Sequence, residues 1–191
     1  ATNVPLVHEA FNWQHGTFMG SIIASEKTAA ADGKVGELRR DPMAMLPFCG
    51  YNMGDYFAHW LKVGSTEGAI MPKVFYVNWF RRGADGRFLW PGFGENARVL
   101  EWIFDRCGGD VDAAETAIGY VPAINDIDTD GLDIALEDME ALLKVDVESW
   151  LDEIPLMREH LEKFGERLPE AMRAELDALE DRLKKEASAA A

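Results

Sequence analysis

Two amphipathic stripes near the C-terminus constrain the fold of this chain more than any other feature of its sequence. In each stripe, large apolar residues recur at intervals of four and three, and the second stripe follows Leu168-Pro169. Residues at this spacing share one face of an α-helix, and proline is well tolerated in the first turn of a helix. The stripes consist of Trp150, Ile154, Met157, Leu161 and Phe164, and of Met172, Leu176, Leu179 and Leu183. We therefore predict that residues 132–187 form three helices that close one side of the domain, and neither stripe is long enough to require a coiled coil.

The acidic charge of the chain is concentrated in the same region. Residues 123–191 hold 20 of the 34 acidic residues but only 8 of the 19 basic ones. Residues 1–122 are nearly neutral, with 14 acidic and 11 basic residues. Solvated negative charge disfavours contact with nucleic acid or an anionic membrane, whereas the near-neutral part could bind a small polyanion. We therefore predict two units, 1–122 and an acidic extension at 123–191, and neither a nucleic-acid nor a membrane partner.

The composition bounds the class of protein. A chain of 191 residues with 48% hydrophobic residues can bury a real core, as one domain or as a domain with an extension. Its two cysteines, Cys49 and Cys107, lie far apart and outside any C-x-x-C pattern, which predicts a reduced, cytoplasmic location. No apolar run has the length of a membrane helix, and no signal peptide is present. Because the chain starts without Met and runs at once into strand-like residues, we expect it to be incomplete.

The first 122 residues alternate strand-like and helix-like segments, which predicts a mixed α/β (α+β) fold. The residues at 16–40 contain an alanine run and two glycines, and no large apolar residue lies between Ser25 and Lys34. This stretch predicts a surface loop or, alternatively, a lid over a ligand. Asp55 is the expected cap of the helix at 53–64. The expected strands are 4–11, 72–80, 87–90 and 116–122, and the expected helices here are 53–64 and 95–107.

Segment 78–96, NWFRRGADGRFLWPGFGEN, gathers five Trp or Phe residues and four glycines. Rings around a flexible loop can sandwich a planar base, and each stack contributes about 1–3 kcal/mol. Discrimination between bases then requires an amide at the base edge, and Asn78 and Asn96 are the candidates. The equally weighted alternative is a hairpin whose rings only pack a small core.

Residues 126–137, DIDTDGLDIALE, match the full calcium-loop pattern D-x-D-x-D-G-x5-E. The preceding residues are strand-like and carry Pro122, so the helix that normally enters such a loop is missing. This context favours an acidic loop in which Asp130 or Asp133 caps the next helix. A non-catalytic calcium-binding helical module centred on 126–137 remains the alternative function.

Other catalytic patterns are weak or missing. Residues 92–97 fit G-x-G-x-x-A before a helix, which alone is a weak dinucleotide signal. The four histidines have no metal-ligand spacing, and each is interpreted as a packed or surface residue: His8, His15, His59 and His160. The sequence contains no G-x-S-x-G, G-K-[ST] or H-E-x-x-H pattern. No catalytic or metal-binding residue is therefore assigned in this chain.

Several stretches closely resemble the C-terminal part of GTP-dependent phosphoenolpyruvate carboxykinase. They are WQHG at 13–16, SEKTAAADGK at 25–34, DPMAMLPFCGYNMGDYFAHWL at 41–61, PKVFYVNWFRR at 72–82, FLWPGFGENARVLEW at 88–102 and IGYVP at 118–122. The resemblance is dense from Val4 to Pro122 and looser along the helical tail. It implies the nucleotide-binding lobe of that fold at 1–122, with a helical extension at 123–191. Members of the family are about three times longer than this chain.

The resemblance also implies an activity and site residues. The family converts oxaloacetate and GTP to phosphoenolpyruvate, GDP and CO2 in gluconeogenesis or anaplerosis. By resemblance, Asn96 contacts the base edge and residues 25–37 form an Ω-loop lid that protects the enolate intermediate. The implied guanine-pocket residues are Trp79, Phe80, Phe88 and Phe93, followed by Gly94, Glu95 and Asn96 in the nucleotide-contacting turn. The implied lid residues are Glu26, Lys27, Thr28, Ala29, Ala30, Ala31, Asp32 and Gly33.

The remaining machinery of the family has no counterpart in these residues. The resemblance implies catalytic Mn²⁺, Mg²⁺ or Mn²⁺ with the nucleotide, a phosphate-binding P-loop and substrate-binding arginines, all upstream of Ala1. It also implies a monomer whose partners are its substrates and the rest of the same enzyme. We therefore expect the isolated chain to be inactive.

Overall fold

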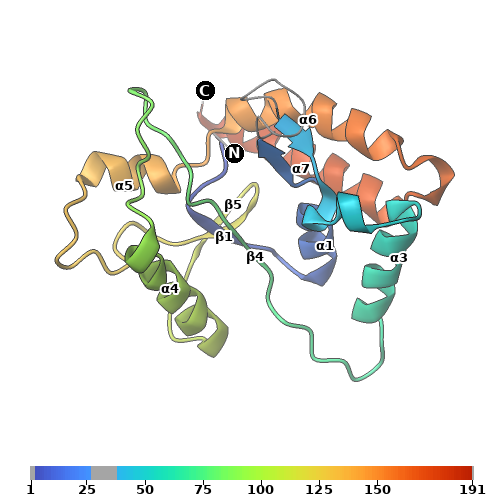
Figure 1. Cartoon of the computed structure of the whole chain (residues 1–191), viewed down its shortest axis with the longest axis horizontal. Coiled ribbons are helices and arrows are strands. Elements are labelled where there is room, and N and C mark those ends of the chain that lie inside the picture. Colours follow the sequence, from blue (N-terminus) through green and yellow to red (C-terminus); the bar gives the residue numbers. More distant parts are fainter. Residues whose placement is uncertain (1–2, 27–37, 191) are drawn as a thin grey trace.

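A four-stranded antiparallel sheet lies at the centre of the computed structural model, with helices on both of its faces (Figure 1). The structure describes residues 3–26 and 38–190. The strand order is β4-β1-β6-β5, and the bounds are β1 Val7–Glu9, β4 Phe75–Val77, β5 Ala114–Thr116 and β6 Gly119–Val121. The combination of helices and antiparallel strands confirms the predicted mixed α/β (α+β) class.

Strand β1 forms the centre of the sheet and is buried along its whole length. It pairs with β4 through Val7↔Val77 and Glu9↔Phe75, and with β6 through Glu9↔Tyr120. The predicted strand at 116–122 is wrong in one respect, because Ala117 and Ile118 form the turn of a β5–β6 hairpin. Gly119 allows this turn, since its φ is +132° and a Cβ there would lie 2.3 Å from the carbonyl oxygen of Glu9.

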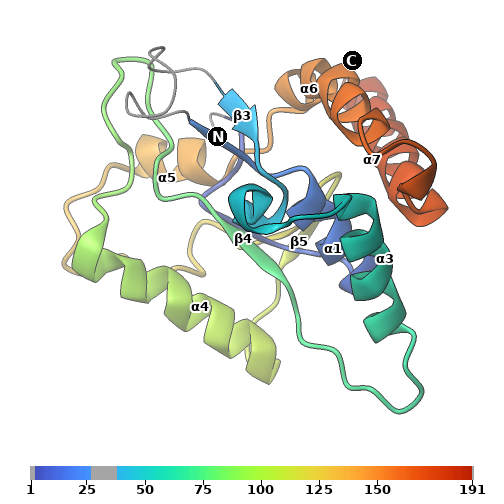
Figure 2. The same cartoon turned by 45° about the vertical axis from the view of Figure 1, so that its right-hand side comes forward.

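The first face of the sheet is covered by four helices that share one hydrophobic cluster (Figure 2). They are α1 Trp13–Ser21, α3 Met53–Gly64, α6 Val147–Glu162 and α7 Glu170–Ala190. The two predicted stripes provide most of this cluster, and all of their residues are buried except Phe164, which is half-buried against it. Apolar burial of this kind is the main stabilising term of the fold.

The second face packs against α4 Asn96–Gly108 and α5 Leu136–Leu143. Leu6, Val99, Trp102 and Leu142 are completely buried here or nearly so. The predicted helix at 95–107 is confirmed by α4, and the three helices predicted within 132–187 are confirmed by α5, α6 and α7. The prediction that all three close one side is wrong, because α5 packs in the second cluster whereas α6 and α7 pack in the first. Both clusters contain residues from 1–122 and from 123–191.

Helix α1 was not predicted, and the helix cap of α3 was assigned to the wrong residue. Six of the nine residues of α1 are buried, so the helix has no polar face and no readable stripe. Asn12 begins it by accepting a hydrogen bond from His15 N at 2.9 Å. Helix α3 is capped by Asn52, which accepts from Gly54 N at 2.8 Å, whereas Asp55 lies in the first turn.

A two-stranded sheet and four 3₁₀ helices complete the fold. In the small sheet, β2 Ala24–Glu26 pairs with β3 Leu38–Arg40. The 3₁₀ helices are η1 Pro42–Ala44, η2 Leu46–Phe48, η3 Phe93–Glu95 and η4 Gly165–Arg167. Across residues 3–26 and 38–190, none of the helices has the length and apolar character to cross a membrane.

Candidate functional site

Three of the four implied pocket rings lie at the surface. The exposed fractions are 66% for Phe80, 47% for Phe88 and 96% for Phe93. Trp79 differs, because it is half-buried against the second hydrophobic cluster. The alternative that these rings only pack a core is therefore wrong for the three phenylalanines. It holds in part for Trp79, one side of which packs against the core.

Phe80 and Phe88 lie next to each other on a narrow hairpin. Their ring centroids are 6.0 Å apart with planes inclined by 67°, and the guanidinium of Arg82 lies 4.1 Å from the centroid of Phe88. The strand predicted at 87–90 is reduced to an isolated bridge between Arg82 and Phe88. A backbone hydrogen bond on each side stabilises this bridge. Gly83 N donates to Arg87 O and Leu89 N donates to Arg81 O, each with a donor–acceptor distance of 3.0 Å.

Two arginines attach this hairpin to helix α5. The buried Arg81 donates from Nη1 to the carbonyl oxygens of Leu142 at 3.3 Å and Lys144 at 2.9 Å. Arg87 donates from Nη2 to both carboxylate oxygens of Asp138, at 2.8 and 2.7 Å. The hydrogen bonds to Asp138 raise the pKa of Arg87. The acidic part of the chain thus holds the aromatic hairpin in place.

The turn at Gly92–Glu95 combines backbone strain with an exposed ring. Gly92 has φ 78° and ψ −165°, and Phe93 has φ 51°. Positive φ is unfavourable for a bulky residue and is retained where the surrounding structure enforces it. A hydrogen bond from Glu95 N to Gly92 O at 3.2 Å closes the turn. The strained backbone therefore directs an almost fully exposed phenylalanine into solvent, where a planar ligand could stack on it.

The two asparagines have different surroundings. Asn78 is buried, where its Nδ2 donates to Val4 O at 2.9 Å and its Oδ1 accepts from Phe80 N at 3.1 Å. Asn96 is the half-exposed first residue of α4, and its Oδ1 accepts from Trp90 Nε1 at 2.9 Å. Asn78 therefore orders the backbone, and Asn96 is the more accessible of the two amides.

Gly94 and Glu95 complete the turn. A Cβ added at Gly94 would meet no atom within 4 Å, so the backbone is open to close approach at this position. Glu95 Oε2 accepts from Arg98 Nε at 2.6 Å, and Arg98 also donates to the carbonyl oxygens of Asp128 and Asp130 at 3.0 and 2.9 Å. Arg98 therefore links the turn to the acidic loop.

That acidic loop does not have the geometry of a calcium site. Asp126 Oδ2 accepts from Ala123 N at 2.7 Å, and Asp128 Oδ1 accepts from Asp130 N at 2.8 Å. Across the described part of the chain, no three His, Cys, Asp or Glu residues are grouped so that they could hold a metal ion. The predicted cap is also wrong, because α5 begins after Ala135 without a side-chain cap.

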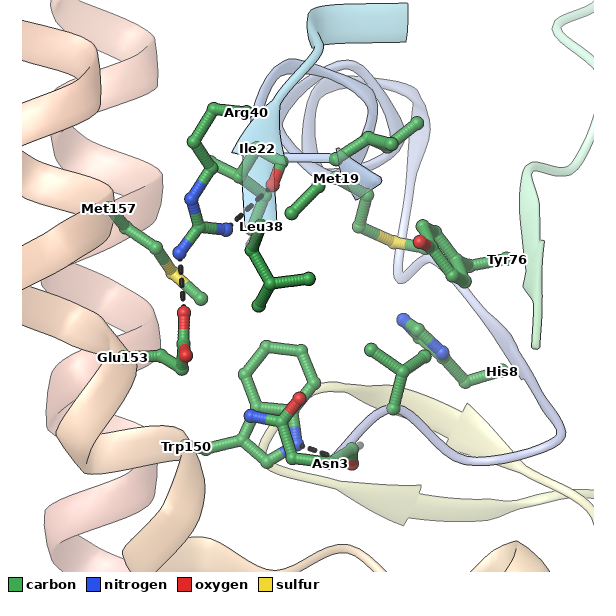
Figure 3. Close-up of a pocket in the computed structure, with 13 residues that line it drawn as sticks. Asn3, His8, Met19, Ile22, Leu38, Arg40, Tyr76, Trp150, Glu153 and Met157 are labelled. Carbon is green, nitrogen blue, oxygen red and sulfur yellow. Dashed lines mark hydrogen bonds and ion pairs between the residues drawn. The ribbon is translucent and has the colours of Figure 1, made fainter. Parts of the chain in front are cut away.

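A separate cavity of about 60 Å³ lies beneath the small β2–β3 sheet (Figure 3). Its wall includes His8, Leu38, Arg40, Tyr76 and Trp150. His8 is packed, as expected, and its buried Nδ1 has no hydrogen-bond partner among the described residues. The pocket is mostly apolar and contains none of the implied guanine-pocket rings. Neither its size nor its lining was foreseeable, because its residues come from five separate stretches of sequence.

The flanks of the implied lid are described, but most of the lid is not. Glu26 is the last residue of β2 and pairs with Leu38. Arg40, on β3, donates to Ile22 O at 2.9 Å and forms an ion pair with Glu153 of α6 (Figure 3). Outside the described residues lie Lys27, Thr28, Ala29, Ala30, Ala31, Asp32 and Gly33.

Comparison with known proteins identifies the family. A family model described as "Phosphoenolpyruvate carboxykinase C-terminal P-loop domain" matches residues 1–182. The phosphoenolpyruvate carboxykinase (GTP) of Treponema pallidum (strain Nichols) is 55% identical over 185 residues, which cover 95% of this chain and 30% of the relative. The enzymes of the same name from Arthrobacter sp. (strain FB24) and Neocallimastix frontalis are also 55% identical, over 183 residues and the same shares. The chain thus spans about a third of the length of these relatives, and it belongs to the phosphoenolpyruvate carboxykinase C-terminal P-loop domain family.

Proposed function

We propose that this chain is the guanine-binding portion of a GTP-dependent phosphoenolpyruvate carboxykinase. The enzyme would convert oxaloacetate and GTP to phosphoenolpyruvate, GDP and CO2, in gluconeogenesis or anaplerosis. The observation that carries the proposal is the exposed, strained Phe93 beside Asn96, in a chain whose family relatives are named as GTP enzymes. Neither burial nor core packing explains why this ring is held in solvent.

The base would lie between the rings of the hairpin and the turn. Phe80, Phe88 and Phe93 supply exposed faces, and Trp79 supports them from the core. Each stacking contact contributes about 1–3 kcal/mol and is nearly indifferent to which base is bound. Asn96 would supply the base-edge hydrogen bond, while Gly94 and Glu95 shape the backbone that approaches the nucleotide.

Residues 25–37 are proposed as the lid of the enzyme, and Glu26 to Gly33 are the residues that would close over the reacting groups. Closure would exclude water and protect the enolate from stray protonation, as closing loops do in other enzymes. The structure describes the two strands that flank this lid, β2 and β3, which pair with each other. Arg40 on β3 forms an ion pair with Glu153 of helix α6 and so connects the strands to that helix.

The metal ions are proposed to be held by another part of the enzyme. Mn²⁺, and Mg²⁺ or Mn²⁺ with the nucleotide, would neutralise phosphate charge during phosphoryl transfer, which depends mainly on positioning and electrostatics. The described residues contain no group of three or more His, Cys, Asp or Glu that could hold such an ion, and no G-K-[ST] pattern for a P-loop occurs in the sequence. The role left to this chain is to bind and orient the nucleotide.

The same proposal covers partners and location. The partners would be GTP or GDP, oxaloacetate or phosphoenolpyruvate, and the rest of the same polypeptide, in a cytoplasmic monomer. The calcium-binding alternative at 126–137 has less support, because the guanidinium of Arg98 already forms an ion pair with the carboxylate of Asp128 at 3.5 Å.

The experiment compares two site variants with one exposed control in the full-length enzyme. Phe93→Ala should weaken GTP binding about tenfold or more, because one stacking face is lost. Asn96→Ala should mainly reduce the preference for GTP over ATP. Phe104→Ala is the matched control, since Phe104 is 78% exposed on the same helix as Asn96 but is not part of the turn. The pocket assignment is wrong if both site variants keep wild-type affinity for GTP and wild-type selectivity over ATP and ITP.

A further inference from the structure

Trp90 is buried and forms a hydrogen bond with Asn96, the residue proposed to meet the base. Its exposed fraction is 2%, and its Nε1 donates to Asn96 Oδ1 at 2.9 Å. We propose that Trp90 is a positioning residue that fixes the orientation of the Asn96 amide and thereby favours a 6-oxopurine over a 6-aminopurine. This inference rests on the proposed function and concerns how the same site recognises its base.

The chemistry of the indole determines which amide atom faces it. An indole N–H can only donate, whereas an asparagine amide offers an acceptor oxygen and a donor nitrogen. Rotation of the Asn96 amide by a half-turn would place two donors against each other and leave the buried indole N–H unpaired. Because an unpaired buried donor is costly, the rotated form is disfavoured on the order of tenfold or more. The oxygen of Asn96 therefore faces Trp90.

The nitrogen of Asn96 consequently faces the side on which a ligand would bind. Among the residues that the structure describes, Asn96 Nδ2 donates to no acceptor, and the residue is half-exposed. Guanine and hypoxanthine present an acceptor at position 6, whereas adenine presents an amino donor there. A fixed outward N–H₂ therefore complements the 6-oxopurines and opposes adenine.

Trp90 is rigidly held, so it can act as a fixed reference for the amide. It packs in the second hydrophobic cluster with Leu89, Val99 and Trp102. The hydrogen bond to Asn96 also spans the Gly92–Glu95 turn, which carries Phe93. Loss of this bond could thus affect both stacking and base choice, but stacking affects all bases alike. Only the ratio of the affinities for different bases therefore reports the orientation of the Asn96 amide.

The test measures dissociation constants of GDP, IDP and ADP for the full-length enzyme with Trp90→Phe. The variant keeps an aromatic ring in the core and loses the N–H donor. We expect the preference for GDP and IDP over ADP to fall about tenfold, because the amide can then rotate.

Trp102→Phe is the matched control for loss of a buried indole. Trp102 lies in the same cluster with an exposed fraction of 1%, and its Nε1 has no hydrogen-bond partner among the described residues. This variant should leave the ratios of the dissociation constants for GDP, IDP and ADP unchanged. If Trp90→Phe fails to fold, benzothienylalanine at position 90 keeps the shape of the indole and replaces the N–H by sulfur, and it should give the same loss of preference.

A third variant tests the direction of the inferred hydrogen bond. Asn96→Asp keeps an acceptor for Trp90 and replaces the outward donor by an acceptor, so the ratio of GDP to ADP affinity should shift towards ADP. An unchanged ratio in Trp90→Phe and in the benzothienylalanine variant would overturn the inference while leaving the site intact. A wild-type enzyme without base preference, whose affinity also survives Phe93→Ala, would instead overturn the proposed function.

Discussion

Phe93 combines a backbone conformation that is unfavourable for folding with a ring that the proposed function would use for binding. Its positive φ costs conformational energy, and its exposed ring gains no burial in return. A ligand that stacks on the ring would recover apolar contact that folding does not provide. Gly92, with φ 78° and ψ −165°, makes this turn possible because that backbone region is almost restricted to glycine.

Two buried histidines make the stability of the fold depend on pH. Burial lowers the pKa of His8 from 6.5 to about 4 and that of His15 to about 3, and the charge of Arg182 also lowers the pKa of His15. The unfolded chain binds protons near pH 6.5, whereas the folded chain does not until lower pH. Stability is therefore fully present above about pH 6.5 and is lost as the pH falls towards these lowered values.

The first prediction concerns His8→Phe. Between pH 7 and about pH 5 the wild-type chain should lose about 2 kcal/mol of unfolding free energy through His8 alone, and the variant should not. Urea unfolding at several pH values measures this difference. His59→Gln is the control, because His59 is exposed. Equal dependence on pH in the wild type and His8→Phe would show that His8 is not neutral in the folded state.

At the scale of elements, helix α3 is docked onto the turn that follows α6. Asn52 Nδ2 donates to Phe164 O at 3.1 Å, and Asp55 forms an ion pair with Arg167. A Cβ added at Gly54 would lie 2.5 Å from the carbonyl oxygen of Arg167, which belongs to the backbone and cannot rotate away. The absence of a side chain at Gly54 thus permits the close approach of the two elements.

The second prediction is that Gly54→Ala destabilises the fold by about 1–3 kcal/mol, because the methyl group forces α3 and η4 apart. Thermal or chemical unfolding measures the change. Gly50→Ala is a suitable comparison, since a Cβ there would meet nothing within 4 Å, and its effect should be small. A neutral Gly54→Ala would mean that the turn at 164–167 moves at little cost.

At the scale of the whole molecule, the two compositional units share both hydrophobic clusters. Helices α6 and α7 supply most of the buried residues of the first cluster, and α5 contributes Met139, Leu142 and Leu143 to the second. Helix α7 also holds the β5–β6 turn, because Arg182 Nε donates to Ala117 O at 2.8 Å. The acidic charge of 123–191 therefore belongs to the outer surface of helices whose inner faces build the core.

The third prediction is that residues 1–122 alone do not form a cooperatively folded domain. Removing 123–191 uncovers α1, α3 and the first face of the central sheet and leaves only α4 on the second face, and burial of apolar surface is the main stabilising term. Circular dichroism and thermal unfolding of 1–122 and 1–191 measure this directly. A sharp unfolding transition of 1–122 would show that 123–191 is an independent appendage.

The spacing of apolar residues was sufficient to predict the helices that bury only one face. The stripes of α6 and α7 predicted those helices correctly, since burial of one face imposes a spacing that the sequence must show. Helix α1 is buried on most sides, so no such spacing exists, and the strands are only three residues long. The cap predicted at Asp130 or Asp133 was wrong because α5 begins after Ala135, and a capping residue type in the preceding loop does not determine where the helix starts.

The sequence by itself determined the family, the fold class and the identity of the aromatic and glycine-rich segment, because each is carried by residues close together in the chain. Only the tertiary structure decided which rings are exposed and which of the two asparagines is buried. Both depend on contacts between distant residues, such as Arg81 with the end of α5 and Asn78 with Val4. Burial is a property of the assembled fold, so two aromatic residues of one segment became core at Trp90 and surface at Phe93.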